Sequence, residues 1–260
     1  LKFLLCSACW GMLKEKLFGR GSYLELLKKR ICGFLDGYQR NIAVIGDESA
    51  GKSSILFDFL DKFWDNRVIV LYLEIRHESL AGFVRRFIGV LLYNFMLNSG
   101  IELKEDLDFL IAKSGRYIPR TVEKIKVILN AVAKRKKQNI ISELLFLYES
   151  IYQETGKPCV VIMDEFCNLE KLGVKNLYRE WSKALIAQKN TMYIICSSAN
   201  FKARAVLSKE LSLLFGNFEI ITVEPFDIKT SGRYLDFKLK SSELNPRLKD
   251  FLVHFTGGYP

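Results

Sequence analysis

One stretch, residues 42–60, constrains the fold of this chain more than any other. It reads IAVIGDESAGKSSILFDFL: an apolar run, a loop of the form G-x-x-x-x-G-K-S from Gly46 to Ser53, and an amphipathic segment. A buried strand entering such a loop and a helix leaving it form the context in which this pattern binds phosphate. Its backbone N–H groups converge on a phosphate chain, and the helix that begins near Lys52 adds the positive end of its dipole. The stretch therefore predicts a nucleoside triphosphate site.

The side chains of this loop predict the parts of the site. We expect Lys52 to bring an ammonium group to the outer phosphates and the Ser53 hydroxyl to hold Mg²⁺. A chance match in a turn rich in Gly and Ser is the alternative, and the agreement of strand, turn and helix argues against it. The residues predicted to surround the nucleotide are Gly46, Asp47, Glu48, Ser49, Ala50, Gly51, Lys52, Ser53 and Ser54.

A second apolar run, CVVIMDEF at residues 159–166, ends in two acids. Carboxylates at the carboxyl end of a strand beside a phosphate loop can order Mg²⁺ and activate water. We expect Asp164 to hold Mg²⁺ through its waters and Glu165 to orient and deprotonate the attacking water as a catalytic base. Two solvated acids in a strand-end turn are the alternative.

Another strand is predicted over residues 191–198, TMYIICSS, and it ends in hydroxyls. The end of such a strand in a parallel sheet lies near the γ-phosphate, so Ser197 or Ser198 could sense that group. Serines that only cap the strand are the alternative.

Predicted strands alternate with predicted helices along the chain, which indicates an α/β fold. The pattern favours a three-layer αβα sandwich in which helices cover both faces of a five-stranded parallel sheet, with the nucleotide at the carboxyl ends of the strands. Strands are predicted over residues 42–45, 67–75, 159–166, 191–198 and 218–226. Helices are predicted over residues 14–36 with an interruption at 18–21, and over 55–64, 80–97, most of 100–137, 140–155, 178–188, 230–239 and 248–255.

The net charge of +10 favours contact with an anion, and the nucleotide, nucleic acid or acidic lipid would each satisfy it. The densest basic run, KRKK at residues 134–137, follows a helical pattern. A solvated helix end, with cations near its negative dipole, explains this run at least as well as a nucleic-acid patch.

Cysteine usage indicates a reducing compartment, and we expect a cytoplasmic protein. Three of the six cysteines, Cys159, Cys167 and Cys196, fall in or beside predicted buried strands, where cysteine behaves as a small hydrophobic residue. Cys6 and Cys9 form one C-x-x-C, but no second such pair completes a zinc site.

No apolar run reaches the roughly 20 residues that span a bilayer, and the longest, residues 87–97, follows Arg85 and Arg86. The first residues, LKFLLCSACWGML, have a lysine and an apolar core but neither an initiating Met nor a clear cleavage site. We interpret them as a helix of a truncated chain, and we expect a further part beyond Pro260.

The choice between ATP and GTP depends on the motifs that accompany the loop. The loop GDESAGKSS resembles that of dynamin-like GTPases, which also need a D-x-x-G and an N/T-K-x-D whose aspartate pairs with guanine. Here Asp164 is followed by EFC, and no N/T-K-x-D occurs in the sequence. ATP is therefore favoured.

Six motifs in order resemble those of the archaeal-type ATPase family, within the AAA+-related and STAND P-loop ATPases. They are LFGRG at residues 17–21, the phosphate loop, ETGKPCVVIMDEF at 154–166, the strand ending at Ser197 and Ser198, LLFGNFEIITVEPF at 213–226 and TGGYP at 256–260. The resemblance implies an ATPase core with a glutamate-containing Walker B strand, a helical lid, and a winged-helix domain beyond the G-x-P.

The resemblance also implies a division of the chain and further nucleotide contacts. Residues 1–40 would be a helical lead-in, residues 41–226 the ATPase core with a helical elaboration at 100–157, and residues 227–260 the lid. Gly258 and Pro260 would approach the adenine, and Gly19 and Arg20 would lie near the base. A plain turn at the start of a helix is the alternative for Gly19 and Arg20.

Two departures from the family pattern bear on activity. Asn217 stands where relatives commonly carry an arginine that reaches the γ-phosphate of a neighbouring subunit, so stimulated hydrolysis in a homo-oligomer needs Arg204 or another arginine. Gly21 stands where relatives often show an acid.

We expect an ATP-binding and Mg²⁺-dependent ATP-hydrolysing molecular switch. One alternative is a DNA-handling AAA+ ATPase, either origin-recognition-like or a transposition helper, which the net charge motivates. The other is a non-hydrolysing scaffold held together by nucleotide, which Asn217 motivates.

Overall fold

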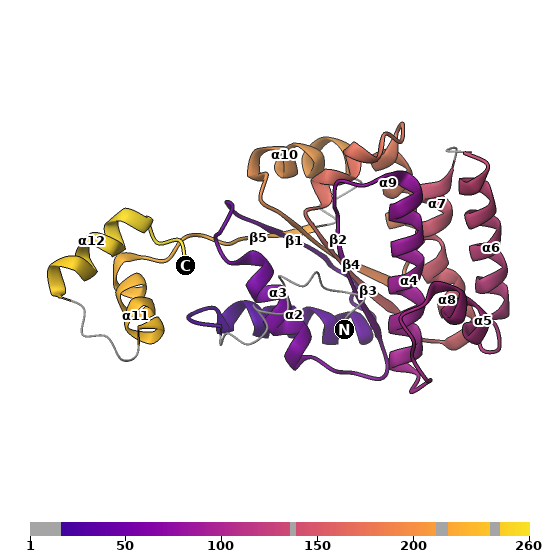
Figure 1. The fold of residues 1–260 in the computed structure, drawn as a ribbon, viewed down its shortest axis with the longest axis horizontal. Coiled ribbons are helices and arrows are strands. Elements are labelled where there is room, and N and C mark those ends of the chain that lie inside the picture. Colours follow the sequence, from indigo (N-terminus) through magenta and orange to yellow (C-terminus); the bar gives the residue numbers. More distant parts are fainter. Residues whose placement is uncertain (1–16, 136–138, 212–217, 240–244) are drawn as a thin grey trace.

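The computed structural model describes residues 17–135, 139–211, 218–239 and 245–260 (Figure 1). Four features discussed above lie outside these residues: the helix expected at the start of the chain, the C-x-x-C of Cys6 and Cys9, part of the basic run at 134–137, and Asn217.

The centre of the described chain is a five-stranded sheet of order β2-β3-β4-β1-β5, in which every neighbouring pair is parallel (Figure 1). β4 therefore lies between β1, which leads into the phosphate loop, and β3, which ends in Asp164. β1, β3 and β4 are buried along their whole length, which explains their continuous apolar sequences. The strands are β1 (Asn41–Ile45), β2 (Ile69–Glu74), β3 (Cys159–Asp164), β4 (Thr191–Ser197) and β5 (Phe218–Thr222).

Helices cover both faces of the sheet, as the alternating sequence predicted. Successive strand residues point to opposite faces: Ile42 and Val44 pack against α2 (Gly21–Leu35) and α3 (Lys52–Lys62), whereas Ala43 and Ile45 face the other layer. That second layer contains α4 (Leu80–Asn98), α5 (Leu107–Ser114), α6 (Pro119–Ala133), α7 (Ile140–Leu145), α8 (Leu147–Thr155), α9 (Leu177–Ala187) and α10 (Asn200–Ala205).

The prediction of a single helix over residues 140–155 is wrong, because the chain forms α7 and α8 with a break at Phe146. Leu144, Leu145, Leu147 and Tyr148 are all buried, whereas Phe146 between them is exposed. At Phe146 the backbone has a ψ of −7°, so the chain departs from regular helix geometry at this residue. Gly156 ends α8 in the left-handed conformation, which glycine adopts readily.

β5 is shorter than the strand predicted over residues 218–226. After Thr222 the backbone N–H of Val223 donates one more hydrogen bond to the carbonyl of Ile45 at 2.7 Å. β1 then ends and turns into the phosphate loop at Gly46, so the continuation of β5 has no strand beside it. Pro225 also lacks the N–H that a ladder needs.

Among the described helices, α4 is long and apolar enough to cross a bilayer by length and composition alone, with a mean hydropathy of 1.4 over its best window. The sequence-based estimate considered only residues 87–97 and missed its full length. The core helix of a globular domain meets the same criterion, and 67% of this window is buried. Phe83, Phe87 and Leu91 pack in the layer that covers β2 and β3.

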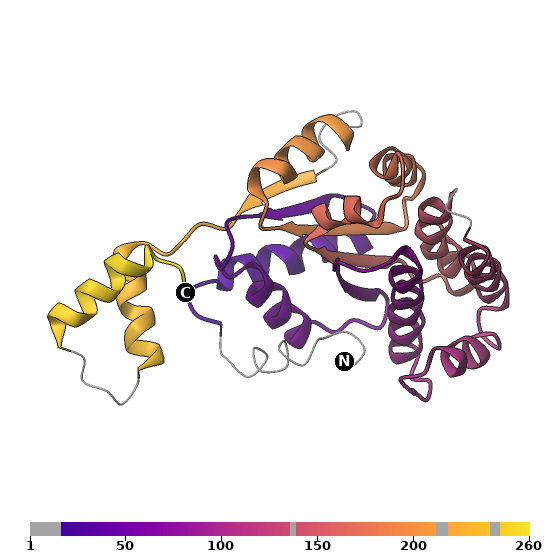
Figure 2. The same cartoon turned by 45° about the horizontal axis from the view of Figure 1, so that its top comes forward.

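The last two helices, α11 (Ile228–Lys238) and α12 (Pro246–Thr256), pair with each other and project away from the sheet, as Figures 1 and 2 show. Lys249 on α12 donates to the Asp236 carboxylate on α11 at 2.6 Å. We call this helical pair the lid. Residues 223–227 connect it to β5, and residues 257–260 lead back to the phosphate loop.

Candidate functional site

The phosphate loop joins β1 to α3 with the strand, turn and helix predicted for residues 42–60. Gly51 has a φ of 89° and precedes the first residue of α3, where a side chain would be strained. Gly46 is fixed by a close approach instead: a Cβ there would lie 2.3 Å from the carbonyl oxygen of Val223. The continuation of β5 therefore crosses the start of the loop closely enough to need glycine.

Lys52 lies within the loop. Its side chain is 5% exposed, and its ammonium group donates to the backbone carbonyl of Asp47 at 2.6 Å. The positive charge of Lys52 therefore lies next to the backbone of the loop that would bind the phosphates. A phosphate group would offer this ammonium a stronger, charge-assisted hydrogen bond than the carbonyl does.

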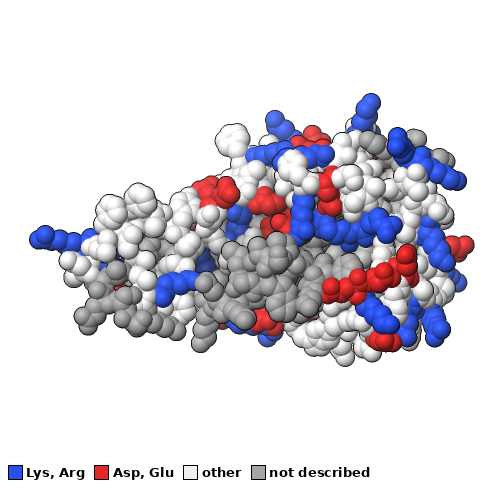
Figure 3. Space-filling model, viewed as in Figure 1, with Lys and Arg blue, Asp and Glu red and all other residues white. Residues whose placement is uncertain are grey.

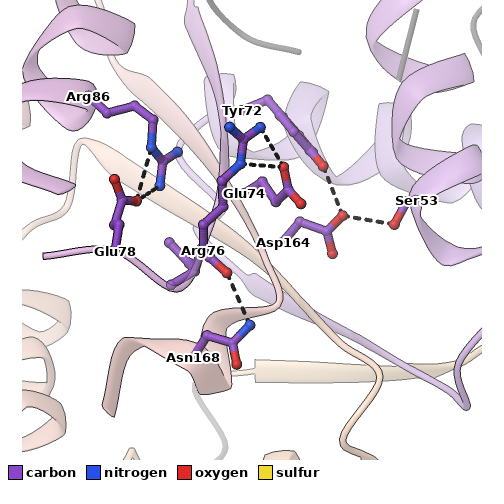
Figure 4. Close-up of polar contacts among 9 residues, drawn as sticks. Ser53, Tyr72, Glu74, Arg76, Glu78, Arg86, Asp164 and Asn168 are labelled. Atoms are coloured by element: carbon purple, nitrogen blue, oxygen red, sulfur yellow. Dashed lines mark hydrogen bonds and ion pairs between the residues drawn. The ribbon is translucent and has the colours of Figure 1, made fainter. Parts of the chain in front are cut away.

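Asp164 is brought to Ser53, although 111 residues separate them in sequence. The Ser53 hydroxyl donates to Asp164 Oδ2 at 2.8 Å, and the Tyr72 hydroxyl donates to the same oxygen at 2.8 Å (Figure 4). The backbone N–H of Glu165 donates to Oδ1 at 3.0 Å. Asp164 is 3% exposed, so these three donors compensate for burying its charge. The predicted pair of Mg²⁺-holding residues is therefore in contact.

Glu165 does not continue the strand, because β3 ends at Asp164. Its φ of 53° is left-handed, an uncommon conformation for a non-glycine residue, and it begins the 3₁₀ helix η1 (Phe166–Leu172). The backbone N–H of Ser198 donates to both carboxylate oxygens, at 2.9 and 3.2 Å. The residue that follows β4 thus fixes the Glu165 carboxylate through two hydrogen-bond contacts.

The two serines at the end of β4 lie differently. Ser197 is fully buried, and its hydroxyl accepts the backbone N–H of Ala199 at 3.1 Å, which is the capping role weighed above. Ser198 lines the same cavity as Glu165. Arg204, the candidate replacement for the missing arginine, donates to the Thr222 hydroxyl at 3.1 Å beside the end of β5.

A cavity of about 690 Å³ lies over the carboxyl ends of the strands, a size typical of small-molecule sites. It collects nine of the predicted residues: Glu48, Ser49, Gly51, Lys52, Ser53, Ser54, Glu165, Ser198 and Pro260. It also has lining residues that sequence reasoning missed: Cys167, Asn168 and Lys171 of η1, Ala199, Lys202 of α10 and Tyr234 of the lid. All of them except Tyr234 follow the ends of β3 and β4, and that position was the available signal.

Arg20 and Gly19 are not among the residues that line this cavity. The Arg20 guanidinium is buried, donates to the backbone carbonyls of Ala50 at 3.2 Å and Glu224 at 2.6 Å, and lies 4.3 Å from the ring centre of Phe226. It ties the phosphate loop to the segment that leads to the lid. The contact of Gly19 and Arg20 with a base stays a prediction.

The end of the chain closes one side of the cavity. Pro260 lines it, and a Cβ on Gly51 would lie 3.6 Å from the Pro260 ring. The Tyr259 hydroxyl donates to the Asp47 carboxylate at 3.0 Å. Gly258 has a φ of 82°, and a Cβ there would meet the Phe226 carbonyl oxygen at 2.1 Å. Glycine at 258 thus allows the chain to return to the loop.

Tyr72 is a further residue of the site that the sequence did not reveal, since a tyrosine in an apolar strand is typical of a core position. Burial and the negative charge of Asp164 raise the pKa of the Tyr72 hydroxyl well above its usual value. The hydroxyl therefore keeps its proton and acts as a donor to the carboxylate.

No family model and no curated protein matches the chain. Among the solved structures that match the chain over almost all of its length, three serve as examples, and the chain spans less than two thirds of each. They are a Walker-type ATPase of Pyrococcus abyssi (17% identity, TM-score 0.64, 95% of this chain and 65% of that one), the ORC1 protein of Aeropyrum pernix in complex with DNA (13%, 0.55, 98% and 58%) and the ORC2 protein of Aeropyrum pernix in ADPNP-ADP complexes (11%, 0.50, 93% and 59%).

Proposed function

From its fold, which is that of archaeal P-loop ATPases related to the AAA+ proteins, we propose that the chain is a cytoplasmic, ATP-binding and Mg²⁺-dependent ATP-hydrolysing switch. One observation carries the proposal. The Ser53 hydroxyl meets the Asp164 carboxylate at 2.8 Å, and Glu165 lies over the same cavity as the phosphate loop. The four free cysteines of the described residues support the compartment, because none forms a disulfide.

The residues present suit Mg²⁺. This ion prefers oxygen ligands and is usually held by one or two carboxylates together with substrate phosphates. Ser53 and Asp164 supply a hydroxyl and a carboxylate that already face one another. Mg²⁺ bound there would supply charge neutralisation at the β- and γ-phosphates. Ser53 would hold it directly and Asp164 through water, while Lys52 would neutralise the outer phosphate oxygens.

Glu165 is the group that would move a proton. Its carboxylate would accept the proton of the water that attacks the γ-phosphate, and the Ser198 N–H, which donates to both of its oxygens, would fix its orientation. The same bond joins the base to the end of β4, so a change in Glu165 would reach the segment that leads into α10.

The lid would respond to the nucleotide. Tyr234 of α11 and Pro260 line the cavity together with the phosphate loop, so a bound nucleotide would contact both parts of the chain. A ligand that contacts two parts favours the arrangement in which both contacts are made. This is the physical basis for a switch.

The nucleotide preference can be tested by titration calorimetry with ATP, GTP and inorganic tripolyphosphate, each with Mg²⁺. We expect ATP to bind more tightly than GTP by at least about tenfold, because the sequence has no N/T-K-x-D whose aspartate would pair with guanine. Equal binding of ATP and GTP would remove the preference for adenine. Failure of all three ligands to bind would remove the proposal.

A DNA-handling role is the second candidate, and the net charge of +10 favours it. Figure 3 shows basic side chains spread over the visible face of both the core and the lid, rather than gathered in one patch. The matched ORC1 structure contains DNA, and this observation concerns ORC1 and not the present chain.

Fluorescence anisotropy with labelled duplex DNA tests this candidate. If DNA is the partner, the logarithm of the binding constant should fall linearly with the logarithm of the salt concentration, and the affinity should change when ATP is added. Binding that is absent at low salt, or indifferent to salt, would contradict the electrostatic argument.

A further inference from the structure

Tyr72 lies where two parts of the candidate metal site meet. It belongs to β2, which is separated from β1 by two other strands, and it faces the side of the sheet that α2 and α3 cover. Its ring centre lies 5.1 Å from that of Phe57 on α3, the helix that begins with Lys52 and Ser53. Its hydroxyl reaches Asp164 at the end of β3. One side chain therefore contacts both the helix and the acid.

The hydrogen bonds of Asp164 divide between its two oxygens. Oδ1 accepts the N–H of Glu165, which belongs to the same turn. Oδ2 accepts the hydroxyls of Ser53 and Tyr72, as Figure 4 shows. Ser53 would turn its oxygen to the metal when the site is filled. The Tyr72 hydroxyl would then stay on Oδ2 as a donor.

We propose that Tyr72 is a positioning residue of the metal site, whose hydroxyl fixes the plane of the Asp164 carboxylate opposite Ser53. Partners behind a metal-holding carboxylate orient it, and their loss typically weakens metal affinity by about 10- to 100-fold. Tyr72 and Asp164 are each 3% exposed, so the hydrogen bond between them is shielded from bulk water. The inference rests on the proposed function, because it concerns the metal of that site.

The test is Tyr72→Phe, which removes one oxygen atom and keeps the ring against Phe57. We expect the Mg²⁺ concentration for half-maximal ATP hydrolysis to rise about tenfold, while kcat at saturating Mg²⁺ changes by less than about twofold. Mn²⁺ titrated into the protein with ADP and followed by electron paramagnetic resonance should also bind about tenfold more weakly. Binding of ATP in EDTA should stay as in the parent protein.

Tyr193→Phe is the matched control. Tyr193 is also fully buried in a strand, and its hydroxyl donates to Gln188 Oε1 at 2.9 Å, away from the cavity. We expect this variant to have the parental Mg²⁺ dependence. If Tyr72→Phe keeps the parental metal affinity, or loses kcat without any change in Mg²⁺ requirement, the inference is overturned. If the parent protein itself binds no Mg²⁺-ATP, the proposed function is contradicted. This result is distinct from a failure of the Tyr72 inference, in which the parent protein binds Mg²⁺-ATP normally.

Discussion

Lys52→Ala is expected to raise the dissociation constant for Mg²⁺-ATP by about 100-fold or more, the largest binding effect among the changes considered. The ammonium group is nearly buried and makes its hydrogen bond inside the loop, to the Asp47 carbonyl. A buried charge that pairs with a ligand typically contributes about 2–5 kcal/mol to binding, and each 1.4 kcal/mol corresponds to about tenfold. Isothermal titration calorimetry measures the loss directly.

Lys62→Ala provides a control on the same helix. Lys62 lies at the other end of α3, where it is exposed and pairs with Asp58 at 2.7 Å, four residues earlier. Such surface pairs contribute little, so both ATP affinity and thermal stability should stay close to those of the parent. Parental affinity in Lys52→Ala, with the control behaving as described, would show that the loop does not grip the phosphates.

Glu165→Gln should separate binding from turnover. Glutamine has the shape of glutamate, and its amide oxygen can still accept the Ser198 N–H, but it cannot take a proton from water. We expect ATP affinity within about threefold of the parent and a single-turnover rate lower by about 100-fold or more, which is the usual contribution of a general base. Quench-flow with radiolabelled ATP measures both.

Glu180→Gln is the companion control for that experiment, because Glu180 is a surface acid of α9 paired with Lys183 at 2.8 Å. Its turnover should equal that of the parent. If Glu165→Gln hydrolyses ATP at the parental rate, Glu165 is not the base. If the parent protein hydrolyses ATP no faster than the uncatalysed reaction, the scaffold alternative is favoured instead.

The parts of the site that could be predicted are those whose functional residues are adjacent in the sequence. Gly46, Gly51, Lys52 and Ser53 lie in one short loop, and Asp164 ends a strand that is apolar throughout. Parallel strands bring their carboxyl ends to one edge of a sheet, so the meeting of Ser53 with Asp164 followed from the strand pattern. The sequence therefore predicted that Ser53 and Asp164 lie close together, but it did not predict the distance between them.

The parts that could not be predicted depend on contacts between distant segments. Tyr72 resembles any core tyrosine until β2 is placed beside β3 and its hydroxyl meets Asp164. The bonds of the Arg20 guanidinium to the carbonyls of Ala50 and Glu224 join residues 30 and 204 positions apart, which the sequence pattern does not reveal. The break at Phe146 is a local change of backbone conformation inside a continuous helical pattern, and periodicity does not reveal such a change.

The crossing of Phe226 and Gly258 has a mechanical consequence. The N–H of Phe226 donates to the carbonyl of Gly258 at 2.8 Å, within two residues of the Tyr259 and Pro260 contacts with the loop. This crossing would be the fulcrum of a lid rotation, and α12, an 11-residue helix of about 16 Å, would be part of the lever arm beyond it. A rotation of about 10° at the fulcrum would carry the far end of that helix through roughly 3 Å. A small movement of the loop at Asp47 and Gly51 would thereby produce a larger displacement at the far end of α12, where a binding partner could respond to it.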